Sequence, residues 1–532
     1  MWSSFFDQAK HYAFLDTVPA TIIAGIVTTY IFLAALLRLT QDKDEPPVIK
    51  TSIPFISPVI GMIQGNSNFY NQMRTKYPHL PIYTLRLPGT RLYIINSPDL
   101  IPLVQRQHRI FSFAPVEARA AKTFMGTSKP GLEIINRNMG GDDSFVPGFL
   151  RAVHPALSPG PELDDLNQNA IQVVLKSLDQ LATKSPASVK LYEWVTHQLF
   201  FATTDAVFGP QNPLRDTVNL ANWYKYEPAL MTLMLDVLPN ILASEGVKAR
   251  EALVDSFVDY LTDKDQVDRG SGYIRRRHDF MTGQGVSLRD IARFEVGGVF
   301  ALVGNTIPTC FWFLYHIFSD PQVLEDCRRE LSNAVREDND TNVVNLEYVK
   351  NSCPIFMSTY QEVFRFHGMG TSARVVLDDH TLDRYRIKKG STILIPAKLQ
   401  HTSEENWGSN VGSFNHRRFV KTPGQKRHNP VAFRGFGGGT TLCPGRHFAT
   451  TEILLFAAVV TLRFEVIPKA AQWPLPTTAK SSQAAALDQP DYDIDVELKL
   501  RPANSASWSV SFPVKDHATL LTAEDISPSN MP

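Results

Sequence analysis

A single cysteine lies in a glycine-rich turn just before a long apolar stretch. The sequence over residues 436–446 is FGGGTTLCPGR, and the helix-like apolar stretch that follows runs to Val460. The free N–H groups and positive end of such a helix would stabilise the Cys443 thiolate. The glycines would let the backbone pass close to a large flat ligand, and Phe436 could shield the sulfur from water. A buried free cysteine is the alternative, but the pattern predicts that Cys443 is the proximal thiolate ligand of a haem iron.

A glutamate and an arginine lie three residues apart in a segment with helical character. Glu362 and Arg365 would share one face of that helix, where they can form an ion pair. Taken alone, this spacing fits an ordinary surface ion pair. A third charged residue, Arg418, follows in the segment FNHRRF at 414–419, upstream of the cysteine loop.

The longest helix predicted in the globular part, 287–318, is apolar except at one point. Gly304, Asn305, Thr306 and Pro308 interrupt the apolar pattern, and a proline inside a helix removes a backbone hydrogen bond and kinks the chain. Such a distortion can admit water or dioxygen, with Asn305 and Thr306 relaying protons. The alternative is a packing kink whose polar groups bond to carbonyls four residues earlier.

The elements that must position these residues are mostly helical. Periodicity predicts helices over most of 163–280, whereas 113–160 gives no clear pattern. Strands are expected at 80–96, as a pair around Pro88-Gly89, and at 375–396. A final hairpin is expected at 493–513. The sequence therefore predicts a mainly α-helical fold with a small sheet.

Composition limits the class of protein. The 532 residues include 53 Lys+Arg and 53 Asp+Glu, and this zero net charge argues against nucleic acid as a partner. With 43% hydrophobic residues the chain can build a large core. Its four cysteines lack paired spacing, so neither a disulfide framework nor a zinc site is expected. A catalytic domain facing the cytosol fits this composition.

The N-terminal region carries a membrane signal. Residues 18–37 contain no Asp, Glu, Lys or Arg, and about 20 apolar residues suffice to cross a bilayer as a helix. The basic residues after this stretch place its C-terminal side in the cytosol, although a cleaved signal peptide is an alternative. The predicted organisation is a lumenal segment at 1–17, an anchor at 18–37, a proline-rich linker at 38–58, a catalytic domain at 59–515 and a disordered tail at 516–532.

Together the cysteine loop, the Glu362–Arg365 helix and the later Arg418 resemble the cytochrome P450 family in type, spacing and order. The resemblance implies the P450 fold, a mainly α-helical haem domain with small β-sheets. It also implies haem b with Cys443 as the axial iron ligand. The family is a family of haem-thiolate monooxygenases, which are oxidoreductases.

The same resemblance assigns roles to further residues. Phe436, Gly439 and Gly445 would contact the haem. Glu362, Arg365 and Arg418 would form a buried charge network that locks the haem-binding loop. Arg374 would bind a haem propionate.

Two departures from the commonest family pattern point to one branch. Most P450 monooxygenases have an acid before the threonine where this chain has Asn305-Thr306, and many have a basic residue where it has Thr441. Both departures are similar to the sterol 7α- and 12α-hydroxylases and prostacyclin synthase. That branch contains hydroxylases and an isomerase that needs no reductase.

The resemblance implies a monooxygenase in the endoplasmic reticulum membrane, single-pass, with its catalytic domain facing the cytosol. It would oxidise a lipophilic substrate, such as a terpenoid, steroid-like or other polycyclic specialised metabolite. Dioxygen and electrons from NADPH would be used, the electrons arriving through a separate NADPH–cytochrome P450 reductase. Basic residues expected to contact that reductase are Lys421, Lys426, Arg427 and Arg434. Two alternatives stay open: a haem-thiolate isomerase of peroxides or epoxides, and a non-catalytic haem-thiolate binding protein.

Overall fold

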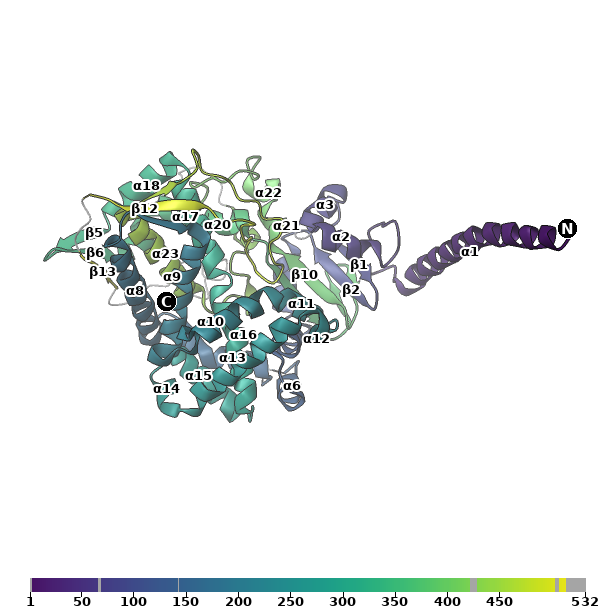
Figure 1. Cartoon of the computed structure of the whole chain (residues 1–532), viewed down its shortest axis with the longest axis horizontal. Coiled ribbons are helices and arrows are strands. Elements are labelled where there is room, and N and C mark those ends of the chain that lie inside the picture. The colour runs from purple at the N-terminus through teal and green to yellow at the C-terminus, as the bar shows by residue number, and fades with distance from the viewer. Residues whose placement is uncertain (1, 66–67, 142, 422–427, 503–506, 513–532) are drawn as a thin grey trace.

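The computed structural model describes residues 2–65, 68–141, 143–421, 428–502 and 507–512. A long N-terminal helix extends away from a body that consists of a small sheet-containing part and a larger helical part (Figure 1). The sheet-containing part lies nearer to the N-terminal helix, beside α2 (Ser57–Gly65) and α3 (Asn68–Lys76).

The largest sheet has five strands in the order β1-β2-β10-β7-β3. Strands β1 (Ile82–Leu87) and β2 (Thr90–Ile95) form the predicted antiparallel pair, and Gly89 takes the positive φ of 73° that their turn requires. Strand β10 (Thr392–Pro396) lies parallel to β2 and antiparallel to β7 (Thr371–Val376), which also pairs with β3 (Phe111–Ser112). This sheet therefore brings β7, the strand that carries Arg374, next to the short β3.

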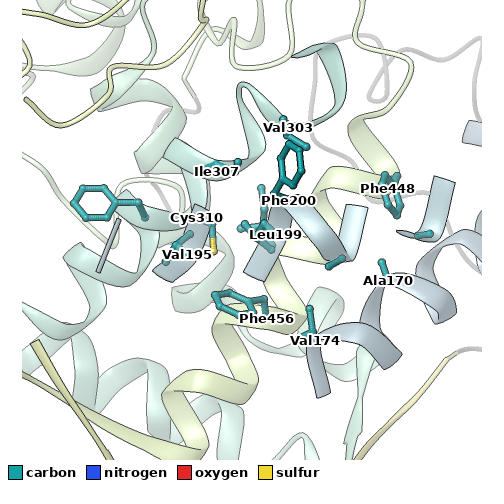
Figure 2. Packing of buried hydrophobic residues seen from close by; sticks show 14 of the residues in the cluster. Ala170, Val174, Val195, Leu199, Phe200, Val303, Ile307, Cys310, Phe448 and Phe456 are labelled. Atoms are coloured by element: carbon teal, nitrogen blue, oxygen red, sulfur yellow. The ribbon is translucent and has the colours of Figure 1, made fainter. Parts of the chain in front are cut away.

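The core of the helical part forms where four helices meet. They are α8 (Pro161–Ala182), α9 (Leu191–Phe208), α17 (Thr306–Phe318) and α23 (Arg446–Arg463). Figure 2 shows apolar side chains of these helices packed together, among them Phe200, Cys310 and Phe456. Helices α17 and α23 are buried along almost their whole length, and both contribute side chains to the lining of the cavity described below.

The long helix predicted over 287–318 is two helices rather than one. Helix α16 (Leu288–Val303) ends at Gly304, and α17 begins at Thr306. Pro308 has no N–H to donate to the carbonyl of Gly304 four residues earlier, so the helical ladder opens at this point. The predicted start is confirmed, because the Ser287 hydroxyl accepts a hydrogen bond of 3.2 Å from the Asp290 N–H.

The segment without a clear pattern, 113–160, is largely helical. It contains α5 (Ala114–Ala120), a π-helical turn at Ala121–Met125, α6 (Lys129–Asn136) and α7 (Phe145–Leu157). The remaining helices are α4 (Leu100–Arg106), α10 (Thr217–Tyr226), α11 (Leu230–Leu235), α12 (Pro239–Leu242), α13 (Ser244–Thr262), α14 (Lys264–Asp268), α15 (Gly272–Gly283), α18 (Pro321–Ser332), α19 (Leu346–Ser352), α20 (Pro354–His367), α21 (Ala397–His401) and α22 (Glu404–Trp407).

The prediction of a hairpin at 493–513 is wrong. Strand β12 (Asp495–Leu500) pairs with β11 (Phe464–Pro468) and β4 (Ala187–Lys190), whereas β13 (Ser507–Ser511) pairs in parallel with β6 (Thr341–Asn345). The two strands therefore belong to different sheets. The other short strands are β5 (Val335–Asp338), which pairs with β6, and β8 (His380–Leu382), which pairs with β9 (Tyr385–Ile387).

Helix α1 (Trp2–Thr40) covers the predicted lumenal segment and anchor and extends to Thr40. Its part Thr21–Thr40 is apolar enough to cross a membrane and is not buried. The segment predicted as a linker is partly packed against the sheet: Val48 pairs with Thr84, and the buried Glu45 accepts a 2.8 Å hydrogen bond from Tyr93. The predicted tail, 516–532, lies outside the described residues.

Candidate haem site

The loop that carries Cys443 is folded back on itself before α23 begins. The Cys443 N–H donates to the Phe436 carbonyl at 2.9 Å, and α23 starts three residues later at Arg446. Burial raises the pKa of the Cys443 thiol, while the Gly445 N–H and the Arg446 charge act to lower it. The start of α23 therefore favours the thiolate form, but burial disfavours it more strongly, so the net effect is a raised pKa.

Two glycines of the loop have backbone conformations that side chains rarely adopt. Gly437 has a φ of +80°, and a Cβ there would lie 2.8 Å from the Thr441 carbonyl oxygen. Gly439 has a φ of +58°, and a Cβ there would meet the Gln105 side chain of α4. The loop therefore needs glycine at these positions for two reasons: the backbone has a positive φ, and neighbouring atoms leave no room for a Cβ.

A cavity of about 410 Å³ lies against this loop. Its lining includes the loop residues Phe436, Cys443 and Gly445, and it reaches Asn305 and Thr306 at the start of α17. The cavity thus brings together the two parts of the sequence that were predicted to carry the chemistry. Gly439 does not line it.

The residues around this cavity fit a haem. Among the described residues there is no group of three or more His, Cys, Asp or Glu side chains that could hold a bare metal ion. A single thiolate suits an iron whose other ligands come from a porphyrin. Two buried guanidinium groups lie nearby, since Arg434 lines the cavity and its charge helps to lower the pKa of Arg374. The propionate carboxylates of a haem would neutralise the two positive charges of Arg374 and Arg434.

Arg374 is held by the cysteine loop and by its own strand. It donates to the hydroxyl of Thr441, to Ser372 Oγ at 3.0 Å and to the carbonyl of Ala373 at 2.8 Å. Burial, with a contribution from Arg434, lowers its pKa to about 10. Arg374 therefore joins β7 to the loop through Thr441, the residue that replaces the family's basic side chain.

The three charged residues of the predicted network meet in the interior. Glu362 accepts from Arg365 Nε at 2.7 Å and from Arg418 Nε at 3.0 Å, and all three are almost fully buried. Both arginines also donate to backbone carbonyls of the segment 401–413. The network therefore fastens α20 to the chain that precedes the cysteine loop.

Helix α20 also contacts the loop directly. The Phe364 ring lies 4.6 Å from the Phe436 ring, measured between centroids. The Arg434 N–H donates to His401 Nε2 at 2.8 Å. Through these contacts the network supports the wall of the cavity.

The prediction that Arg434 is a surface residue that contacts the reductase is wrong. It is only 6% exposed and lines the cavity, because the chain turns inward at the start of the cysteine loop. Lys421 is exposed. Lys426 and Arg427 lie outside the described residues.

Asn305 and Thr306 both make hydrogen bonds within the protein. The Thr306 hydroxyl donates to the Leu302 carbonyl at 2.9 Å, the bond to an earlier carbonyl considered above as an alternative. The Asn305 side-chain oxygen accepts from the Ala486 N–H at 2.7 Å. Ala486 and Leu487 also line the cavity, but the sequence gives no sign of this, because alanine and leucine carry no chemical signal.

The fold and this site define a haem-thiolate protein. The family model described as cytochrome P450 matches residues 46–496, and the chain belongs to the cytochrome P450 family. The monooxygenase nodJ of Hypoxylon pulicicidum is 31% identical over 478 residues, which cover 87% of this chain and 91% of that protein. The cholesterol 7-alpha-monooxygenase of Cricetulus griseus is 23% identical over 87% of this chain and 95% of its own length.

A solved structure agrees in fold. The retinoic-acid-bound cyanobacterial CYP120A1 has a TM-score of 0.66 and 16% sequence identity, and the match covers 87% of this chain and all of that one. The predicted family, mainly helical fold and enzyme class are confirmed. The chain is a haem-thiolate monooxygenase, and its family uses haem with a cysteine thiolate ligand and electrons that derive from NADPH through a reductase.

Proposed function

We propose that this protein is a membrane-anchored monooxygenase that hydroxylates or oxidises a lipophilic, polycyclic substrate. Electrons would come from NADPH through a separate cytochrome P450 reductase. The observation that carries the proposal is the cavity that joins Cys443 to Asn305 and Thr306. Bound haem would supply the activation of dioxygen and the oxidising equivalent for a C–H bond.

The side chains around the cavity have distinct proposed roles. Cys443 would bind the iron, and the Gly445 N–H would stabilise its negative charge. The Thr306 hydroxyl can turn from the Leu302 carbonyl and donate a proton into the cavity at the break between α16 and α17. Asn305 is a neutral amide, so it can hold a hydrogen bond there without changing its own charge.

The cavity wall supports an apolar substrate. Most of the side chains that line it are apolar, including Phe113 and Val116 of the region before α6 and Leu487 near the C-terminus. Such a wall excludes water and favours hydrocarbon surface. The names of the relatives support a polycyclic class, since one is a cholesterol 7-alpha-monooxygenase.

Membrane attachment is supported by two surfaces. The exposed apolar part of α1, Thr21–Thr40, is long enough to span a bilayer. Exposed apolar side chains also cluster on α11, α12 and the turn between them, namely Leu235, Val237, Leu238, Ile241 and Leu242. We infer a single-pass protein of the endoplasmic reticulum whose catalytic domain faces the cytosol, which is where the reductase would dock.

The first experiment is the absorption spectrum of the dithionite-reduced protein with carbon monoxide, for the native chain and for Cys443→Ala. A strongly red-shifted Soret band that is lost in the variant supports a Cys443 thiolate ligand. A band at the position of histidine-ligated haem, or no haem at all, contradicts the proposal.

Turnover then separates the three candidate functions. A hydroxylated sterol or terpenoid that forms only with reductase, NADPH and dioxygen identifies a monooxygenase. A product formed from a peroxide or epoxide without NADPH identifies an isomerase. Tight ligand binding without any product identifies a binding protein.

A further inference from the structure

The side chain of Asn305 holds a wall of the cavity in place. Its Oδ1 accepts the Ala486 N–H at 2.7 Å, and Asn305, Ala486 and Leu487 all line the cavity. Asn305 lies at the break between α16 and α17, whereas Ala486 lies in the segment before β12. This hydrogen bond therefore joins two distant parts of the chain at the cavity surface.

The segment around Ala486 is held on its other side by the end of α20. The Ala486 carbonyl accepts the Met369 and Gly370 N–H groups at 2.8 and 3.0 Å. A Cβ on Gly370 would lie 2.9 Å from the Ala486 Cβ, so the two chains are in close contact. One residue beyond Leu487, the Asp488 N–H donates to the His367 carbonyl at 2.9 Å.

Helix α17 adds a second hydrogen bond to this segment. Trp312 Nε1 donates to the Asp488 carbonyl at 2.8 Å. The segment is thus fixed by main-chain hydrogen bonds to residues 367–370, at and just after the end of α20, and by side-chain hydrogen bonds from Asn305 and Trp312. Of these two side chains, only Asn305 lines the cavity.

The hydrogen bond to Ala486 also settles the orientation of the Asn305 amide. A backbone N–H can bond only to the amide oxygen, so Nδ2 must occupy the other position. Within the described part of the chain, no acceptor bonds to this Nδ2 group. Because the residue lines the cavity, its two N–H donors remain for whatever occupies that space.

We propose that Asn305 has two functions: its oxygen fixes the Ala486–Leu487 wall, and its nitrogen binds the substrate by donating a hydrogen bond to one of its oxygen atoms. The preferred substrates are then lipophilic molecules that carry a carbonyl, ether or hydroxyl oxygen near the carbon that is oxidised. This inference rests on the proposed function, which supplies the bound substrate. An ionised acid at this position could accept from Ala486 but could not donate.

The test uses two probes with one skeleton, camphor and bornane, which differ by a ketone oxygen. Dissociation constants are measured from the Soret shift of the ferric full-length holoenzyme in lipid nanodiscs. A single hydrogen bond predicts that the native protein prefers camphor by roughly three- to tenfold. In Asn305→Leu the two dissociation constants become equal, whereas the control Val116→Ala changes both by a common factor.

Hydrogen exchange resolved at the Ala486 amide tests the fixing of the wall independently. Exchange is expected to be at least about tenfold faster in Asn305→Leu than in the native protein, because the amide loses its acceptor. Asn305→Asp retains an acceptor oxygen and is expected to keep the amide protected.

Each outcome decides part of the proposal. Equal affinities in the native protein, or an unchanged preference in Asn305→Leu, overturn the role of the nitrogen. Unchanged exchange at Ala486 in Asn305→Leu overturns the role of the oxygen. A native protein without the red-shifted carbon monoxide band would instead contradict the proposed function, and the exchange measurement would still decide whether Asn305 holds the wall.

Discussion

At the scale of single residues, the cysteine loop depends on backbone that only glycine tolerates. Gly437 combines a φ of +80° with a Cβ position 2.8 Å from the Thr441 carbonyl oxygen. We expect Gly437→Ala to destabilise the folded protein by about 1–2 kcal/mol or more and to lower haem retention, because the loop must shift. Thermal unfolding and the ratio of Soret to protein absorbance measure the two effects.

Gly412→Ala is the matched control for that substitution. Gly412 is exposed, and a Cβ there meets nothing within 4 Å. The control should retain haem as well as the native protein does. Equal haem retention in Gly437→Ala and Gly412→Ala would show that the loop tolerates a side chain.

A buried carboxyl group in α23 makes stability depend on pH. Burial raises the pKa of Glu452 to about 8 from its ordinary 4.5, although the Thr203 hydroxyl donates to it at 2.8 Å. The folded state therefore holds a proton that the unfolded state releases. The stabilisation is fully present below pH 4.5 and is lost as the pH rises through about 8.

Replacement of Glu452 by Gln removes the titrating group. The native free energy of unfolding should fall by up to about 1.4 kcal/mol for each pH unit in this window, and the variant should lose that part of the slope. Denaturant midpoints measured from about pH 5 to about pH 10 give the slopes on both sides of the folded-state pKa. Thr203→Val removes the hydrogen bond that lowers the pKa and should extend the sloping region to higher pH; parallel curves for all three proteins would contradict a protonated Glu452.

Residue identity and spacing predicted which residues belong to the site, but they did not predict what surrounds each of those residues. Glu362, Arg365 and Arg418 are charged residues, which are unusual in a core, so their spacing carried information before any packing was known. Arg434 was predicted to be on the surface because a lone arginine in a polar loop usually is. The burial of Arg434 depends on how the loop packs against α20, and this packing cannot be predicted from the local sequence.

At the scale of elements, the charge network joins α20 to the segment that leads into the cysteine loop. Glu362→Ala leaves Arg365 and Arg418 buried without a counter-charge, and we expect a loss of about 3–5 kcal/mol. The expected product is a protein that does not retain haem. Haem content and denaturant unfolding of the purified protein measure the change.

Arg417 provides a neighbouring control for the network. Its side chain is 50% exposed and pairs with Asp326, which also contacts Arg329 and His416. Arg417→Ala should cost about 1 kcal/mol or less because water and the other partners remain. If the loss of the charge network costs no more than the loss of this half-exposed ion pair, the network does not have its proposed role in holding the loop.

Elements defined by local signals were predicted, and those defined by distant partners were not. The β1–β2 pair follows from the turn at Pro88-Gly89, and the start of α16 follows from its Ser287 cap. The pairing of β12 and β13 with strands more than 100 residues earlier has no local signal, so adjacency wrongly suggested a hairpin. The break at Gly304 was expected as a kink but not as a separation into two helices.

At the scale of the whole molecule, the end of the N-terminal helix is fixed to the globular part. Arg91 donates to the Thr40 carbonyl at 2.8 Å, and Arg86 donates to the Thr40 hydroxyl at 3.0 Å. The bond from Arg91 satisfies one of the backbone carbonyls that have no partner within the helix at the C-terminus of α1. Helix α1, the proposed anchor, therefore leaves the body from the sheet-containing part, as Figure 1 shows.

The exposed apolar residues of α12 and the preceding turn predict membrane contact beyond that anchor. A chain that begins at Leu39 keeps the contacts of Thr40 and should still bind liposomes in a flotation assay. Replacing Leu238, Ile241 and Leu242 by serine in that chain should weaken binding by at least about tenfold, because three exposed apolar side chains are removed.

The comparison needs a control that removes three exposed hydrophobic side chains elsewhere on the surface. Ile467, Leu475 and Tyr492 are also exposed, on β11 and the segment before β12. Their replacement by serine should leave liposome binding unchanged if attachment is local to α12. Equal losses in the two triple variants would mean that liposome binding follows overall hydrophobicity. A loss confined to the α12 variant would place α12 in the bilayer surface together with the proposed anchor. That result would define which face of the molecule turns towards a lipophilic substrate.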